Sequence, residues 1–305
     1  MSDTSVRPSR SAMASLGVAV VAVSWAAILI RLADAPTLVI AFWRLALATG
    51  LLAPVAALHA RRAGRTSPPG PTARDRRGMP WLVPVAGALL AGHFVLWIAS
   101  LFLTSVANSV MLVTTQPIFA ALLARPLLGE PAPVRTWAAI ALSLAGALCI
   151  TARDLTVSRA AMVGDLLAIL AAAAAATYLV LGRRARDTGP LTVYLTRVNG
   201  VATGLLLLCC LLFDAPLRGY APATWAAFAA LAVGPHLAGH GLLNFAVRRL
   251  PAPAVNLALL GEPILSTIYA ALLFHEIPTG WFYVGGALVL TGVGVEFVPR
   301  GGRRR

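Results

Sequence analysis

The stretch AVNLALLGEPILSTIYAALLFHE, residues 254–276, has a copy earlier in the chain, NSVMLVTTQPIFAALLARPLLGE, residues 108–130. The two stretches align without a gap, with Pro263 lying 146 residues after Pro117. We expect each to be an apolar helix interrupted near its middle, because an internal proline lacks the N–H that a helix needs. In a membrane protein built from repeats, proline-interrupted segments at matching positions indicate a binding site.

The composition requires a lipid environment. Apolar residues make up 59% of the 305 residues, and the mean hydropathy is +0.81, more than a soluble domain can hide from water. The net charge of +14 comes from arginine, since the chain contains no lysine. These arginines lie in short gaps between apolar runs, which indicates orientation in a membrane and not nucleic-acid binding. The three cysteines lie within apolar runs and are expected to be small packing residues: Cys149, Cys209 and Cys210.

Ten apolar segments are long enough to cross a bilayer, at about 20 residues each. The sequence therefore predicts an all-α polytopic membrane protein with ten transmembrane helices. The predicted spans are 12–30, 37–59, 80–100, 104–124, 134–151, 162–182, 190–213, 222–247, 252–274 and 279–298.

The arginine distribution predicts the orientation of these spans. An even number of spans puts both termini on one side of the membrane. If that side is the cytoplasm, nineteen of the 25 arginines lie in inside segments, four in outside segments and two within spans. Because basic residues favour the cytoplasmic side of short loops, we expect both termini and the loops 133–137 and 182–190 to be cytoplasmic.

The copied stretch is part of a repeat that covers both halves. Pro36 precedes Arg44 by eight residues where the second span begins, and Pro190 precedes Arg197 by seven where the seventh begins. Each half has five spans, an odd number, so the second half enters the membrane from the opposite face. We predict two inverted five-helix repeats with a pseudo-twofold axis in the membrane plane, on which the two central prolines superpose. The predicted repeats are residues 1–155 and 156–305.

Glu262 is the main candidate for a functional residue. It lies near the middle of the ninth span, where a charged acid costs roughly 2.5–3.5 kcal/mol on insertion scales. It is therefore expected to be protonated, paired or facing a wet cavity, either as the counterion of a substrate amine or as a proton-coupling site. The alternative is a neutral carboxyl that supports the backbone beside Pro263. Gln116 occupies the matching position and cannot titrate, but it can hydrogen-bond a ligand.

The two arginines within spans allow two interpretations. Arg44 and Arg197 could pair with a substrate carboxylate or phosphate, or extend their long side chains to the nearer headgroups. Trp97 also lies within a span, where packing is favoured over stacking against a ligand.

Histidines form the third polar set. His93 and His240 each stand ten residues before a leucine in matching spans. His236 and His240 are four residues apart, a metal-ligand spacing, but without cysteine ligands the pattern favours hydrogen-bonded cavity histidines and no metal. Asn244 extends that helix face, where a helix-to-helix hydrogen bond is the alternative role. Pro235 is expected to break this span and to bend it.

These residues predict one cavity. We expect spans three, four, eight and nine to line it, with Glu262, Gln116, His93 and His240 as its main polar groups. Buried polar groups need partners or water, and lipid offers neither. Glu130 and Glu276 end their spans at opposite faces and are expected to be helix-end or gate groups.

The sequence resembles the EamA family of the drug/metabolite transporter superfamily over nearly its whole length, as two repeats. The resemblance rests on VSWAAILIRL in the first span, on the proline-to-arginine entries of spans two and seven, on the opening of the second half, and on the repeated proline-to-glutamate runs. The last two features read GDLLAILAAAAAATYLVLGRR, QPIFAALLARPLLGE and EPILSTIYAALLFHE.

This resemblance implies a bacterial plasma-membrane carrier in which spans one to four and six to nine surround a central cavity. Family members export amino acids and other small metabolites, so we expect a secondary transporter working by alternating access, without a cofactor. Proton coupling and a homodimer stay open. The alternatives are a membrane enzyme acting on a lipid-linked substrate, which would need paired acids or a metal site, and a channel.

Overall fold

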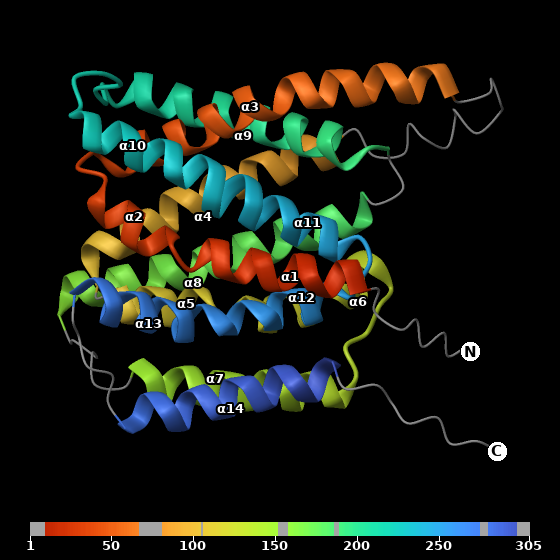
Figure 1. Cartoon of the computed structure of the whole chain (residues 1–305), viewed down its shortest axis with the longest axis vertical. Coiled ribbons are helices and arrows are strands. Elements are labelled where there is room, and N and C mark those ends of the chain that lie inside the picture. Colours follow the sequence, from red (N-terminus) through yellow and green to blue (C-terminus); the bar gives the residue numbers. More distant parts are fainter. Residues whose placement is uncertain are drawn as a thin grey trace.

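The computed structural model describes residues 10–66, 81–104, 106–151, 158–185, 189–274 and 280–297, and these contain helices and no strands. The helices run roughly parallel or antiparallel to one another (Figure 1), and the start of α1 and the end of α14 lie at the same end of the bundle. The first half comprises α1 Arg10–Val23, α2 Ala26–Leu32, α3 Thr37–Thr66, α4 Leu82–Leu103, α5 Val106–Val113, α6 Gln116–Leu128 and α7 Val134–Thr151. The second comprises α8 Arg159–Arg184, α9 Leu191–Leu212, α10 Pro222–Leu231, the π-helix η4 Ala232–His240, α11 Gly241–Val247, α12 Ala252–Ala258, the 3₁₀ turn η5 Leu259–Gly261, α13 Glu262–Phe274 and α14 Gly280–Phe297.

The proline-interrupted segments are broken where the sequence predicts. A turn at Thr114 and Thr115 separates α5 from α6, whose second residue is Pro117. In the second half, η5 separates α12 from α13, whose second residue is Pro263. The first turn of a helix tolerates proline, because a backbone N–H at that position would have no partner within the helix. Pro235 lies inside η4, so the eighth span widens into a π-helix and does not break.

Local sequence also fixes several helix ends. Ser158 caps α8 by accepting a hydrogen bond from the backbone N–H of Ala161 at 3.0 Å, as N-cap serines do. Gly129 ends α6 with φ of 70°, a left-handed conformation that glycine adopts without steric cost. One prediction was too short: α3 continues to Thr66, beyond the predicted end at residue 59.

Length and surface composition identify an integral membrane protein. Eight helical stretches of the described residues are long and apolar enough to cross a bilayer, and Val134–Cys149 is a shorter apolar helix. Large apolar side chains lie on outward faces, including Leu212, Leu290 and Leu272, the last of which is 71% exposed. Such faces are stable in contact with lipid tails and not with water.

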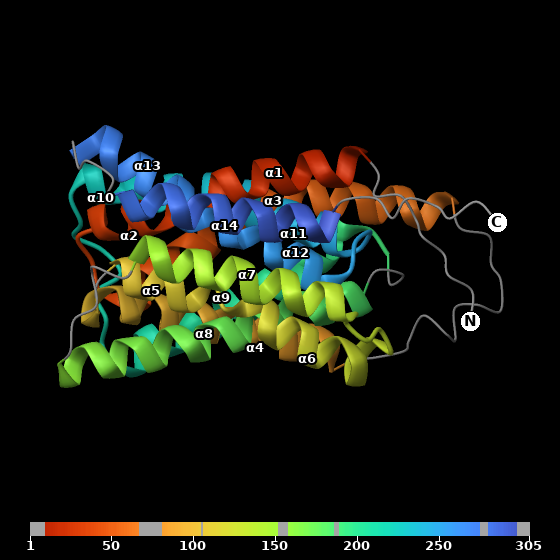
Figure 2. The same ribbon diagram turned by 90° about the horizontal axis from the view of Figure 1, so that it is seen from below.

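Helices α7 and α14 form a pair on one side of the bundle, at the bottom of Figure 1 and in front of the other helices in Figure 2. Glycines allow their close approach: a Cβ added at Gly146 would lie 2.5 Å from the carbonyl oxygen of Gly285, and one added at Gly292 would lie 2.8 Å from that of Ala139. Ser143 donates to the carbonyl oxygen of Val289 at 3.4 Å, across 146 positions of sequence. Small residues therefore let these two backbones touch.

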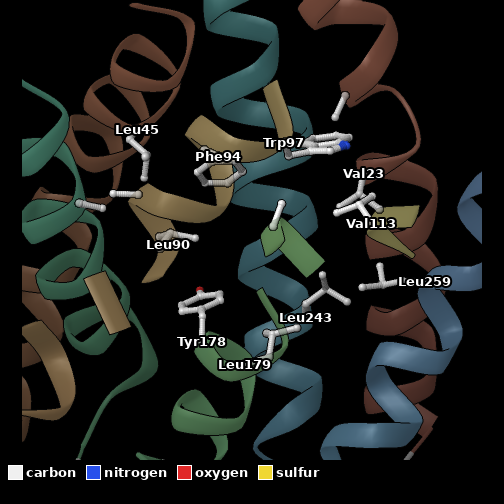
Figure 3. Close-up of a cluster of buried hydrophobic side chains, with 14 of the residues drawn as sticks. Val23, Leu45, Leu90, Phe94, Trp97, Val113, Tyr178, Leu179, Leu243 and Leu259 are labelled. Carbon is white, nitrogen blue, oxygen red and sulfur yellow. The ribbon is translucent and has the colours of Figure 1, made fainter. Parts of the chain in front are cut away.

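The remaining helices surround the core of the bundle. Helix α4 packs against α8, while α1 packs against η4 and α11, and α3 packs against α9. The core side chains come from both halves of the chain (Figure 3), with Phe94 and Trp97 from α4, Tyr178 from α8 and Leu243 from α11. The cavity lies within this core.

Candidate functional site

A cavity of about 30 Å³ lies where the two halves of the chain meet. It is lined by α1, α2, α3, α4, α5, α6, α8, α11, η4, η5 and α13. The lining residues are Val23, Ala26, Arg44, His93, Trp97, Val113, Gln116, Ala175, Tyr178, Leu179, His240, Leu243, Leu259 and Glu262.

Six of the eight sequence-predicted site residues line this cavity. They come from positions far apart in the chain: Arg44, His93, Trp97, Gln116, His240 and Glu262. The predicted lining by spans three, four, eight and nine describes part of the cavity, because α1, α3 and α8 contribute as well. Asn244 and Arg197 do not line it.

The helix breaks set the positions of Gln116 and Glu262. Gln116 is the first residue of α6 and Glu262 is the first residue of α13. Both are buried, at 6% and 5% exposed, and Oε1 of Glu262 has no hydrogen-bond partner among the described residues. The amide and the carboxyl therefore lie at the start of two half-helices, where the helix dipole presents partial positive charge.

Arg44 is the cation of the cavity. It projects from the first third of α3, its side chain is fully buried, and its guanidinium carbon lies 4.1 Å from the centre of the Phe94 ring. Its Nε, Nη1 and Nη2 atoms have no hydrogen-bond partner within the described part of the chain. It forms no ion pair with Glu262, although both groups line the same cavity.

Three histidines lie together beside this arginine. His93 donates from Nδ1 to the carbonyl oxygen of Ala171 at 3.0 Å, which leaves Nε2 as an acceptor on the neutral ring. Its ring centre lies 6.0 Å from Trp97 and 5.9 Å from His240. His236 stacks on His240 at 5.6 Å but does not line the cavity. In the described ranges, no three or more His, Cys, Asp or Glu side chains are grouped so that they could hold a metal ion.

Asn244 hydrogen-bonds to Tyr178, a cavity residue that the sequence analysis did not identify. Its Nδ2 donates to the Tyr178 hydroxyl at 2.5 Å and to the backbone oxygen of His240 at 2.9 Å. Tyr178 lines the cavity from α8, and since its oxygen accepts from Asn244, its own O–H remains available to donate. Asn244 thus makes the helix-to-helix hydrogen bond that was the alternative to a cavity role. Tyr178 lies in an alanine-rich run with no motif around it, so no sequence pattern identified it.

Arg197 lies apart from the cavity. It is exposed on α9, so the structure contradicts the cavity role predicted for it and is consistent with the extension toward headgroups. The reason is the helix period. Arg44 follows Pro36 by eight residues and Arg197 follows Pro190 by seven, and one residue rotates a helix face by about 100°.

A partly buried ion pair bridges helices at one end of the bundle. Arg183, near the end of α8, donates from Nε to Oε2 of Glu130 at 2.7 Å and from Nη2 to Oε1 at 2.8 Å. Its Nη1 donates to the carbonyl oxygens of Val247 at 3.0 Å and Leu250 at 2.6 Å. Glu130 thus ties α6 to α8 and, through Arg183, to the linker between α11 and α12. Glu276, its sequence counterpart, lies outside the described residues.

The opposite end of the bundle is more open. A hollow of about 510 Å³ lies around the link between α2 and α3, at the end away from α6 (Figure 1). Arg31, Asp34 and Tyr220 contribute its polar groups, and Phe102 lies beneath Arg31 at 5.8 Å. The two ends therefore differ, one bridged by an ion pair and the other hollowed.

Comparisons with known proteins identify a family and a solved structure of similar fold. A model of the EamA-like transporter family matches residues 11–152 and again residues 162–297. A solved structure described as "Crystal structure of protein" has a TM-score of 0.74 and 21% identity, and the match covers 93% of this chain and 96% of that chain. That likeness concerns the fold alone. No curated protein matches the sequence.

Proposed function

This chain belongs to the EamA-like transporter family, within the drug/metabolite transporter superfamily, and we propose that it is a secondary transporter of small metabolites, amino acids or related compounds. We propose that it exports them by alternating access through the central cavity. The observation that carries this proposal is the cavity itself, where buried polar groups from both halves of the chain meet without partners of their own.

Unpartnered polar groups in a membrane protein call for a ligand or water. Each buried donor or acceptor left without a partner costs about 1–3 kcal/mol, and lipid cannot supply one. Arg44, Glu262, Trp97 and His240 all leave such atoms in one cavity. A polar solute that enters would satisfy several of them at once.

The size of the cavity supports a cycle of opening and closing. The cavity has only about 30 Å³ of free space between its lining side chains, so its helices must move apart before a bulkier metabolite can enter. The Glu130–Arg183 pair bridges one end, and the 510 Å³ hollow lies at the other. We infer that this conformation is sealed at the Glu130 end and partly open at the opposite end.

We further propose that the chain forms ten spans in two inverted repeats, 1–155 and 156–305. Ser143 contacts Val289, exactly one repeat length of 146 residues away, as expected where equivalent positions meet on a twofold axis. Gly146 and Gly292, which are also 146 residues apart, each lie against the partner helix of the α7–α14 pair. Inverted repeats of this kind place the binding site at their interface.

The arginine distribution supports a location in the bacterial inner membrane with both termini in the cytoplasm. In that orientation the Glu130–Arg183 pair lies at the cytoplasmic end and the hollow around Asp34 at the outer end. An export cycle would then load substrate when the pair opens and release it through the hollow.

Counterflow in proteoliposomes tests the proposal. Vesicles containing the purified protein and loaded with an unlabelled amino acid mixture should accumulate labelled amino acid transiently, and vesicles loaded with buffer should not. Glu262→Gln should reduce this exchange. Glu296→Gln is the matched control, since Glu296 accepts a hydrogen bond from Thr136 in the α7–α14 pair, away from the cavity. A channel would equilibrate the label without counterflow, and equal exchange by both variants would contradict the role of the cavity.

A further inference from the structure

Arg44 is the most strongly buried charge of the described chain that has no polar partner. Its side chain is 0% exposed, and none of its three guanidinium nitrogens makes a hydrogen bond. By contrast, Arg183 donates four hydrogen bonds. A guanidinium has five donors in a fixed planar fork, so Arg44 presents an unused fork inside the cavity.

The surroundings of Arg44 hold it in place without satisfying it. The centre of the Phe94 ring lies 4.1 Å from its guanidinium carbon, a cation–π contact. This contact supplies no hydrogen-bond acceptor, so the three nitrogens stay without a partner. Such a group suits a planar anion, because two parallel N–H groups of a guanidinium match the two oxygens of a carboxylate.

Glu262 supplies a carboxyl group at the same cavity, which carries the opposite charge when it is ionised. Its Oε1 has no partner, and it forms no ion pair with Arg44. A carboxylate is acceptor-only, so it can receive an ammonium group but not an anion. The lining therefore offers one group for an anion and one for a cation, neither of which is in an ion pair. Apolar surface from Val23, Val113 and Leu259 lies beside them.

We propose that Arg44 is the carboxylate-binding residue of this cavity and that Glu262 receives an ammonium group of the same molecule. This inference rests on the proposed transport function and defines its substrate class as a zwitterion that carries one carboxylate and one amine. A phosphate monoester fits less well, because its two negative charges would face a single arginine and the carboxyl of Glu262.

The apolar lining defines the rest of the molecule. Among the described lining residues, Arg44 and Glu262 carry the charged groups, and much of the remaining surface comes from Trp97 and aliphatic side chains. A small or apolar side chain satisfies this surface, whereas a second charge would be buried without a partner.

The test compares matched ligands with matched variants. Purified protein is titrated with sets of four ligands that differ only at the charged ends: an amino acid, its methyl ester, the amine that lacks the carboxylate and the acid that lacks the amine, for alanine, leucine and phenylalanine. Binding is followed by thermal shift and by calorimetry. Wild-type protein should prefer the acid over its ester by about tenfold or more, the factor expected for a charge-assisted hydrogen bond.

The variants separate Arg44 from general effects of charge. Arg44→Gln should bind acid and ester equally, and Arg44→Lys should keep part of the preference, because an ammonium retains the charge and loses the fork. Arg197→Gln is the matched control, since it removes the counterpart arginine from an exposed position of α9 and should leave the preference intact. Glu262→Gln should remove the preference for the amino acid over the corresponding acid without an amine.

Each outcome has a defined meaning. An acid preference that persists in Arg44→Gln, or the absence of binding by any acid to the wild-type protein, would overturn the assignment. If vesicles exchange esters or amines as well as acids, the carrier function stands and the role of Arg44 fails. If acids bind through Arg44 and no vesicle exchanges them, the site stands and the proposed transport fails.

Discussion

The Glu130–Arg183 pair provides a way to perturb one end of the transporter without touching the cavity. We predict that Glu130→Ala shifts the conformational equilibrium toward the state open at this end. The two hydrogen bonds that would be lost measure 2.7 and 2.8 Å and join α6 to α8. Arg183 would keep its two carbonyl partners, so the end of α8 retains its contact with the α11–α12 linker.

The size of the effect follows from the burial of the pair. A hydrogen bond to a charged group is worth about 1.5–3 kcal/mol when buried, and breaking a fully buried pair costs about 3–5 kcal/mol. The Arg183 side chain is 10% exposed, but that of Glu130 is 34% exposed, so solvent screening reduces the figure. We expect about 2 kcal/mol, which is roughly a 30-fold change in the ratio of closed to open states.

Cysteine labelling measures this shift. Leu179 lines the cavity and lies four residues before Arg183, or about 6 Å along the helix. In a background where the three native cysteines are serine, Leu179→Cys should react with an impermeant maleimide about 30-fold faster when Glu130→Ala is added, in vesicles with this end facing the medium.

The matched control removes a glutamate that bridges two other helices. Glu296→Ala breaks the hydrogen bonds to Thr136 in the α7–α14 pair and should leave the labelling rate of Leu179→Cys unchanged. If Glu130→Ala labels no faster than this control, the pair does not restrain the end of the bundle and the reasoning is wrong.

Three further predictions concern the cavity, the packing and the orientation. Glu262→Gln should weaken amino acid binding in calorimetry by about tenfold, equivalent to about 1.4 kcal/mol; unchanged binding with lost pH-driven transport would instead mark proton coupling, and no change in either would leave a structural role. Gly292→Leu should destabilise the protein by at least about 1–3 kcal/mol in thermal unfolding, because an added Cβ would lie 2.1 Å from a serine hydroxyl oxygen, whereas Gly294→Leu, with no atom within 4 Å of its added Cβ, should not. In intact cells a cysteine at position 156 should be labelled from outside and one at 186 should not, both positions lying outside the described residues; the reverse result would contradict the predicted orientation.

The sequence indicated a cavity because polar residues within apolar spans need polar partners or water. In a chain this apolar, a glutamate, a glutamine and two histidines within predicted spans must turn toward one another or toward water. The proline interruptions then indicated where in the membrane the cavity lies, since they placed Gln116 and Glu262 at matching breaks near the middle of their spans. Both inferences depend on periodicity and solvation, which are local in sequence.

The contacts that the sequence could not predict depend on which helices meet. Glu130 was recognised as a helix-end group, but Arg183 was counted only as one of many basic residues near the cytoplasmic face. Their pairing requires that the ends of α6 and α8 lie together, and no periodicity encodes that. Arg44 and Arg197 show the same limit, because a one-residue difference in spacing buries one and exposes the other.

The arrangement of charges has a consequence for coupling between the two halves. The cation of the cavity, Arg44, belongs to the first half, while the carboxyl, Glu262, belongs to the second. A zwitterion held at both ends would therefore bridge the halves, whereas a ligand with only one of these charges would hold a single half. If movement of one half against the other accomplishes transport, only the bridging ligand stabilises the closed state through which exchange must pass.

We therefore expect a difference between occupancy and transport. An amino acid methyl ester or a simple carboxylic acid, supplied at a concentration sufficient to compete with the amino acid for binding, should occupy the cavity without supporting counterflow. The measurement compares competition in calorimetry with exchange of labelled amino acid from vesicles loaded with each analogue. Exchange at equal rates from vesicles loaded with the analogue and with the amino acid would show that closure needs only one charged contact, and the division of charge between the halves would then have no role in transport.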